Sequence, residues 1–273
     1  MSGFCIHRRR LLAGLAVGPL LATAPARAGF ASARLTVTVQ GAGPDVVLVH
    51  GLNSSRAVWN ALVAAVPGIR WHLVQIAGFG GLAAGANAGG AVLGPVTAEI
   101  ARYCTENGLR RPAVIGHSMG GIIALMLGLR FPTVPGRLMV VDILPAPARG
   151  FGLDPSMRDL FDGLQAALGG QRAMAALMGL FGGDGASDSR VSATALRELA
   201  ETDLGPALAR LAAPLTVVYA EPPPDMADPR RIAARYRAAY PRARLEGVAD
   251  SGHMVMLDKP DRFSSLVKTF LSG

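Results

Sequence analysis

The feature that most constrains the fold of this 273-residue chain is a repeated alternation of short apolar segments with helix-like segments. A continuous apolar run such as residues 46–49 is typical of a strand that is buried on both faces. Similar runs recur at residues 70–77, 112–116, 137–143 and 214–220, with helical patterns between most of them. This alternation predicts an α/β fold with a mostly parallel central sheet flanked by helices.

The stretch after residue 32 predicts how the sheet begins. Residues 33–40 alternate polar and apolar side chains, which is typical of a strand with one exposed face. A glycine- and proline-containing turn at residues 41–44 leads into the apolar run at residues 46–49. We therefore expect an edge hairpin that feeds directly into a buried strand.

The alternation is interrupted once. The segment from Pro145 to about Leu211 contains no convincing strand and has glycine-broken helical pieces rich in alanine and methionine. Because the segment lies between two predicted strands, we expect a lid insertion over about residues 145–211 that caps one end of the sheet. No internal repeat or second core is apparent, so residues 29–273 are predicted to form one α/β domain that includes this lid.

The first 28 residues have the pattern of an export signal. Arginines 8–10 precede an apolar run over residues 11–24 and the small residues Ala26 and Ala28. This order matches the basic, apolar and A-x-A regions of a signal peptide, and the paired arginines resemble a twin-arginine signal. The apolar run is shorter than the roughly 20 residues of a membrane span. We expect cleavage after residue 28, a periplasmic or secreted protein and no stable membrane span; twin-arginine and general secretory export both stay open.

Charge and cysteine content argue against other classes of protein. Residues 1–28 hold four arginines and no acidic residue, so their removal lowers the net charge from +8 to +4. A net charge this small, without a basic tract in the rest of the chain, argues against nucleic acid as a partner. The same cleavage leaves Cys104 as the lone cysteine, so no internal disulfide is expected. Cys104 lies in a helix-like segment and is interpreted as core filling and not as a nucleophile.

The segment that points to chemistry is VIGHSMGG at residues 114–121. Apolar runs on both sides of it predict a buried strand, a tight turn and a buried helix. A G-x-S-x-G pattern in that context, from Gly116 to Gly120, lifts Ser118 out at the end of the sheet as a nucleophile. At this point the chain resembles the α/β-hydrolase superfamily, in its esterase-like branch, across essentially all of residues 34–273.

The resemblance implies a catalytic triad in the order serine, aspartate, histidine. It assigns the base to His253, which follows the last predicted strand and begins a loop before the final helix. Two other histidines are weaker candidates. His72 lies in a predicted strand and is interpreted as structural, and His117 is expected to point away from the neighbouring serine.

An oxyanion site is implied by the same resemblance. A strand that ends in His50-Gly51 is similar to the loop whose backbone N–H faces the nucleophile in this superfamily. The implied donors are the backbone N–H groups of Leu52 and Met119. A helix that begins at Met119 adds a positive dipole end there. His50 itself is expected to shape the loop and not to act in catalysis.

The acid of the triad has more than one candidate. Many relatives have it after the penultimate strand, but here that place reads VVYAEPPPDMADP, with a proline at the expected aspartate position and Glu221 and Asp225 out of register. Asp142, at the end of the strand after the nucleophile helix, is the favoured assignment, because some esterases of this superfamily take their acid from that strand end. A buried aspartate also needs a partner, which a histidine N–H supplies. Asp225 and Glu221 stay open as alternatives.

These residues predict an exported serine carboxylester hydrolase. His253 takes the proton of Ser118, Ser118 attacks an ester carbonyl, and water then releases the acyl group. No cofactor and no metal is expected, since the sequence has no HExxH, paired CxxC or Walker pattern. A lactonase, a perhydrolase or acyltransferase on the same triad, and a catalytically silent binding module stay open as alternatives.

The substrate is expected to be a small-molecule ester with an apolar acyl or aromatic group. The predicted lid is apolar and poor in charge, and Met119, Met254 and Met256 flank the catalytic positions. Ordinary packing of a lid accounts for the same residues, so the acyl length stays open. The sequence also leaves the oligomeric state open.

Overall fold

A computed structural model describes residues 30–147, 186–221 and 230–273 of the chain. The predicted export signal, a large part of the predicted lid and Asp225 lie outside these described residues. The export and lid assignments therefore stay predictions. Within the described part of the chain, no helix is both long and apolar enough to cross a membrane.

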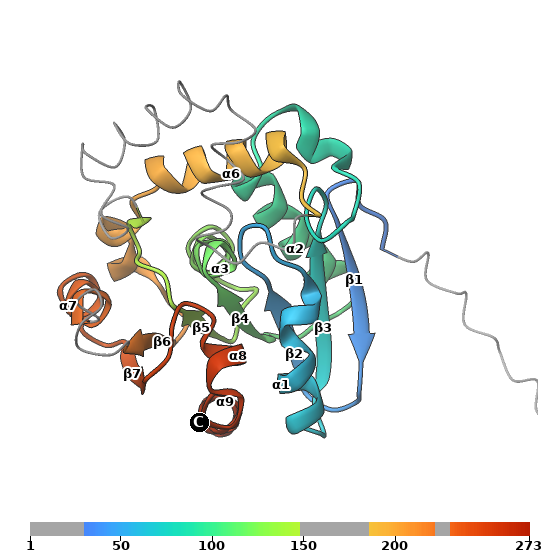
Figure 1. Cartoon of the computed structure of the whole chain (residues 1–273). Helices are drawn as coiled ribbons and strands as arrows, with labels where there is room; N and C mark the ends of the chain where they lie inside the picture. Colours follow the sequence, from blue (N-terminus) through green and yellow to red (C-terminus); the bar gives the residue numbers. More distant parts are fainter. Residues whose placement is uncertain (1–29, 148–185, 222–229) are drawn as a thin grey trace, which may run out of the picture.

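A mixed sheet forms the centre of the molecule (Figure 1). Its seven described strands are β1 (Leu35–Gln40), β2 (Asp45–Val49), β3 (Arg70–Ile76), β4 (Ala113–His117), β5 (Arg137–Val141), β6 (Leu215–Glu221) and β7 (Arg244–Ala249). They are ordered β1-β3-β2-β4-β5-β6-β7, and every neighbouring pair is parallel except β1 with β3. The predicted α/β fold with a mostly parallel sheet is confirmed.

The predicted hairpin at the start of the sheet is wrong. β1 is an edge strand, but it pairs with β3 and not with β2, which lies between β3 and β4. The turn after β1 crosses over the start of β3 so closely that a Cβ at Gly41 or Gly43 would overlap the backbone carbonyl of Ile69 or Gly68. Two glycines at positive φ let the chain make this crossing. The turn therefore passes over β3 and connects β1 to β2, which are not neighbours in the sheet.

Helices cover both faces of the sheet. They are η1 (Arg56–Trp59), α1 (Asn60–Ala65), η2 (Gly85–Gly89), α2 (Leu93–Glu106), α3 (Met119–Arg130), α6 (Ser189–Glu201), η4 (Gly205–Arg210), α7 (Arg230–Ala239), α8 (Val255–Asp258) and α9 (Pro260–Ser272). Val47 and Val49 of β2 pack into a core with α2, α3, α6 and α7, whereas Val46 and Leu48 pack into a second core with α1, α8 and α9. Side chains on successive strand residues point to opposite faces, so one apolar run supplies both cores.

Helix α6 lies over the carboxyl ends of β2 and β3, and Figure 1 shows it crossing above α3. The N–H of Asp188 donates to the carbonyl of Gly78, just after β3, at 2.7 Å. The Glu198 carboxylate accepts the backbone N–H groups of Val92 and Leu93 at 2.9 and 2.8 Å. A residue of α6 therefore satisfies donors at the beginning of α2, which would otherwise lack partners within their own helix.

Candidate active site

Ser118 lies in a strained turn between β4 and α3. Its backbone has φ 52° and ψ −121°, a conformation that a residue with a side chain rarely adopts. The glycines on either side are required by close approach: a Cβ at Gly116 would overlap the carbonyl of Gly120, and a Cβ at Gly120 would overlap that of Val49. The turn holds the Ser118 side chain at the carboxyl end of the sheet, as expected of a nucleophile there.

Backbone hydrogen bonds fix this turn. The N–H of Ser118 donates to the carbonyl of Val141 at 2.9 Å, and the carbonyl of Ser118 accepts from Gly121 N–H at 2.8 Å. The first bond ties the turn to the end of β5 and the second begins α3. The serine is thus positioned by the two elements that precede and follow it and by the neighbouring strand.

Asp142 follows β5 directly and lies beside His253. Its Oδ2 accepts from His253 Nδ1 at 2.7 Å, and its Oδ1 accepts from the N–H of Ala220 at 2.8 Å. The N–H of Asp142 donates to the carbonyl of Val218 at 2.8 Å, and its φ is 51°. Both carboxylate oxygens of this buried residue are therefore partnered, which offsets the cost of burying a charge.

His253 lies in the loop between β7 and α8 and is partly exposed. In an imidazole whose Nδ1–H is held by a carboxylate, the nitrogen that can act as a base is Nε2, on the opposite edge of the ring. The ring of His253 has its centroid 4.6 Å from that of His117, the residue before Ser118. The base candidate and the nucleophile candidate are thus brought together from distant parts of the chain.

The other acid candidates lie as follows. Glu221 is the last residue of β6, pairs in the sheet with Ala249, and has its carboxylate beside Gly247. Asp225 lies outside the described residues. Of the three candidates, Asp142 is the one with a described hydrogen bond to His253.

The loop after β2 lies beside Ser118. A Cβ at Gly51 would stand 3.1 Å from Ser118 Cβ. The Nε2 of His50 accepts from the N–H of Ile76 at 3.1 Å, which leaves the ring proton on Nδ1 to donate to the carbonyl of Gly51 at 2.8 Å. His50 thereby fixes the course of the loop that leads to Leu52, one of the expected oxyanion donors.

Two residues of the site region were not singled out by the sequence patterns. Asn53 has φ 54° and is buried, and its Oδ1 accepts from Ser192 Oγ of α6 at 2.6 Å. The His50-Gly51 pattern in the sequence indicates the loop that contains Asn53, so it could have drawn attention to this residue. No local pattern marks Ser192 as its partner, since the pair is 139 positions apart in the sequence.

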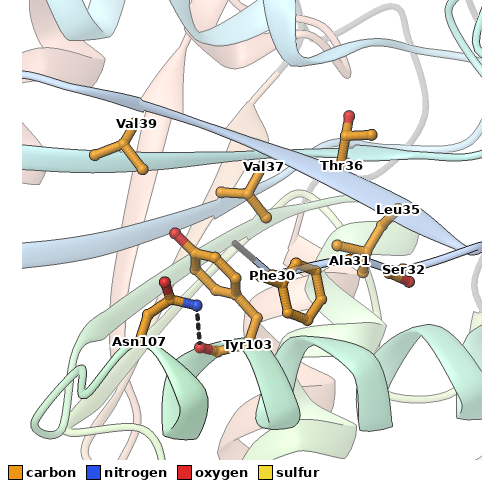
Figure 2. Close-up of a pocket in the computed structure, with 9 residues that line it drawn as sticks. All are labelled: Phe30, Ala31, Ser32, Leu35, Thr36, Val37, Val39, Tyr103 and Asn107. Carbon is orange, nitrogen blue, oxygen red and sulfur yellow. Dashed lines mark hydrogen bonds between the residues drawn. The ribbon is translucent and has the colours of Figure 1, made fainter. Parts of the chain in front are cut away.

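A separate hollow of about 410 Å³ lies at the sheet edge (Figure 2). It is lined by Phe30, Ala31, Ser32, Leu35, Thr36, Val37, Val39, Tyr103 and Asn107. None of the predicted catalytic residues lines it. Among the described residues, no group of three or more histidine, cysteine, aspartate or glutamate side chains is arranged to hold a metal ion.

Comparison with known proteins identifies the class to which this fold and site belong. Residues 46–266 match the alpha/beta hydrolase family, and the chain belongs to that family. It is a hydrolase by this membership.

Particular relatives are esterases by name. A pimeloyl-[acyl-carrier protein] methyl ester esterase of Vibrio vulnificus is 32% identical over 126 residues, which is 45% of this chain and about half (47%) of the relative. The enzyme of the same name from Serratia marcescens is 26% identical over 84% of this chain and 94% of its own length. The esterase EaEST from Exiguobacterium antarcticum has a TM-score of 0.73 at 20% identity, covering 88% of this chain and 96% of that one, which shows a shared fold.

Proposed function

We propose that this protein is an exported serine esterase that cleaves small carboxylic esters through Ser118, His253 and Asp142. The observation that supports this best is a serine in a strained strand-to-helix turn whose preceding residue, His117, has its ring against that of a histidine held by a buried carboxylate. Esterase names among its relatives support the same class of reaction.

The proposed reaction runs through an acyl-enzyme. Nε2 of His253 takes the proton of Ser118 Oγ as that oxygen bonds to the ester carbonyl carbon, and the carbonyl oxygen becomes an oxyanion. The backbone N–H groups of Leu52 and Met119 stabilise this oxyanion. The intermediate collapses, the alkoxide leaves with the proton from His253, and the acyl group stays on Ser118. Water, deprotonated by His253, then attacks the acyl carbon. As the bond to Ser118 Oγ breaks, His253 returns the proton to that oxygen, which releases the carboxylic acid and restores the serine.

The decisive test combines a covalent label with a substrate panel. A fluorophosphonate should label the parent protein on Ser118, and Ser118→Ala should neither be labelled nor hydrolyse an activated ester. A panel of esters from acetate to laurate measures the preference for acyl length. A parent protein that stays unlabelled and inactive would contradict the proposal and favour a catalytically silent binding module.

An apolar acyl or aromatic ester is the proposed substrate class. Two neighbours of the proposed triad support it, since Met119 is buried directly after Ser118 and Met254 lies partly buried directly after His253. Flexible thioether side chains suit an apolar ligand of variable shape. The sequence of the lid proposed for residues 145–211 is apolar and poor in charge, which fits the same substrate class. Trimming it should alter the acyl-length preference more than the hydrolysis of a small acetate ester.

Export to the periplasm or the medium is proposed from the amino-terminal pattern alone. Amino-terminal sequencing of exported protein should begin near Gly29. Replacing arginines 8 and 9 together by lysine should block a twin-arginine route and leave general secretory export in place. Protein that still begins at Met1 outside the cytoplasm would contradict cleavage.

A further inference from the structure

His117 has a ring that touches two other parts of the proposed site. Its Nε2 lies 2.9 Å from the backbone carbonyl of His253, so Nε2–H donates to the loop that bears the base. The Nδ1–Cε1 edge of the ring faces Gly51, where a Cβ would stand 2.9 Å from Nδ1 and 3.3 Å from Cε1. The residue before Ser118 is therefore wedged between the base loop and the loop that leads to Leu52.

The protonation state of this ring is set by its surroundings. Burial holds the pKa of His117 well below its ordinary value, and the nearby His253 ring lowers it further, although the hydrogen bond to the His253 carbonyl acts in the opposite direction. The ring is therefore neutral at physiological pH and has one proton, which the carbonyl of His253 holds on Nε2. Nδ1 has no hydrogen-bond partner among the described residues, so the one bond at Nε2 fixes the tautomer.

Such a contact has a clear use in a site assembled from separate loops. His253 is oriented by Asp142 through its side chain, and the His117 bond holds the backbone of the same residue. These two hydrogen bonds, one to the side chain and one to the backbone of His253, restrict both the position and the orientation of its ring. Proton transfer from Ser118 depends on that placement, since small displacements of catalytic groups lower turnover strongly.

We propose that His117 is a positioning residue of the esterase, one that ties the loop of His253 to the turn of Ser118 by its Nε2–H bond and packs against Gly51. This inference rests on the proposed function and adds to it a role for a histidine that does not take part in proton transfer. It also predicts that a side chain at position 51 would disturb the His117 ring, since an added Cβ would stand 2.9 Å from Nδ1.

The test compares two substitutions of similar shape. In His117→Gln the side-chain amide can still donate to the His253 carbonyl, whereas in His117→Met an unbranched side chain of similar length cannot. We expect kcat of His117→Gln to stay within about threefold of the parent and kcat of His117→Met to fall about 10- to 100-fold, with KM changed less than about threefold in both. Fluorophosphonate labelling should slow in parallel with kcat.

His72 supplies the matched control. It is also a buried histidine of the sheet, but its hydrogen-bond partners are Tyr103 and Asp45. His72→Met should lower the melting temperature and leave kcat near that of the parent. Equal kcat values for His117→Gln and His117→Met would overturn the positioning role, whether both match the parent or both fall while the proteins melt alike.

A measurement on the parent protein tests the bond without comparing rates, and it needs only one folded His117 variant for assignment. With ¹⁵N-labelled histidine, the ring signal that is lost in that variant should stay neutral with its proton on Nε2 from about pH 5.5 to about pH 8. The loss of a separate signal in His72→Met tells the His72 ring, whose Nε2 contacts Asp45, apart from it. A His117 ring that titrates in this range, or that has its proton on Nδ1, overturns the inference. A parent that is neither labelled nor active overturns the proposed function, and with it any catalytic role of His117, whereas the ring spectrum would still report the bond.

Discussion

The hydroxyl of Ser192 donates to the side-chain oxygen of Asn53 at 2.6 Å, and both residues are buried. Asn53 follows directly on Leu52, a proposed oxyanion donor, and Ser192 lies in the first turn of α6. The hydrogen bond therefore fastens a helix that lies over the strand ends to the loop beside the nucleophile. The position of α6 and the course of that loop are coupled through this side-chain pair.

Removing the Ser192 hydroxyl should destabilise the protein, because Asn53 Oδ1 is left buried without this donor. We expect Ser192→Ala to lower the free energy of unfolding by about 1–3 kcal/mol in urea titrations. Ser189→Ala makes the same chemical change at an exposed position of α6 and should have an effect within about 0.5 kcal/mol. Similar losses in both variants would mean that the Ser192–Asn53 bond adds no stability.

Replacing Asp142 by asparagine should nearly abolish turnover. Asparagine keeps the shape but favours the wrong tautomer of the histidine, and the corresponding change in a serine protease costs about 10⁴-fold in kcat. Asp142→Asn should therefore approach the rate of Ser118→Ala on an activated ester. Thermal melting of each variant checks that it is folded.

Asp225→Asn and Glu221→Gln are the comparisons for that experiment. Both should keep turnover near that of the parent if Asp142 is the acid. Near-parent turnover of Asp142→Asn together with a large loss in either comparison would move the acid to that other residue and leave Ser118 and His253 in place.

A single methyl group at position 51 should disturb catalysis. In Gly51→Ala the new Cβ would stand 2.9 Å from His117 Nδ1 and 3.1 Å from Ser118 Cβ, so one of these neighbours must shift. We expect kcat to fall at least about tenfold. Gly89→Ala is the control, since a Cβ there has no neighbour within 4 Å, and it should keep the parent rate. An unchanged kcat in Gly51→Ala would show that the loop absorbs the methyl group freely.

Stability should fall below about pH 6.5 in part because of His72. Burial lowers the pKa of His72, although its hydrogen bond to Asp45 acts in the opposite direction. Above the unfolded-state pKa of about 6.5 the ring is neutral in both states and its contribution is complete; below it the unfolded chain binds a proton that the folded chain resists, so stability is lost as the pH falls. The pKa of Asp45 is lowered, chiefly by a hydrogen bond with Arg70, so Asp45 stays charged above about pH 5.

Urea titrations at about pH 7.5 and about pH 5.5 measure this contribution. The parent should lose more stability between the two values than His72→Gln does, even though the variant is less stable at the higher pH. His117 contributes a change of the same sign to both proteins, so the difference between them isolates His72. Equal losses would mean that His72 has the same pKa in the folded and unfolded states.

The sequence predicted the elements that depend on local patterns. The apolar run before Ser118, the glycines around it and the helix after it are contiguous, and the structure has that strand, turn and helix. Asp142 could be proposed because a carboxylate at the end of an apolar strand is itself a signal. The bond between Ser192 and Asn53 could not be proposed, because neither residue type implies a distant partner.

The pairing of β1 is the instructive failure. A short turn between two strand patterns favours a hairpin, but β3 is buried along all but its first residue and needs a neighbour on each side. The pairing of β1 is thus decided by β3, which comes later in the sequence. The local turn residues Gly41 and Gly43 are compatible with β1 pairing with β2 and with β1 pairing with β3.

The contacts that assemble the site join positions far apart in the chain: 111 residues separate Asp142 from His253, and 136 separate His117 from His253. Contacts between such distant positions form late, because closing long loops costs entropy before the contacts repay it. Helices can therefore be complete while the site is still absent. Ester hydrolysis during refolding would then report the finished tertiary structure, and its recovery should lag behind the return of helical circular dichroism.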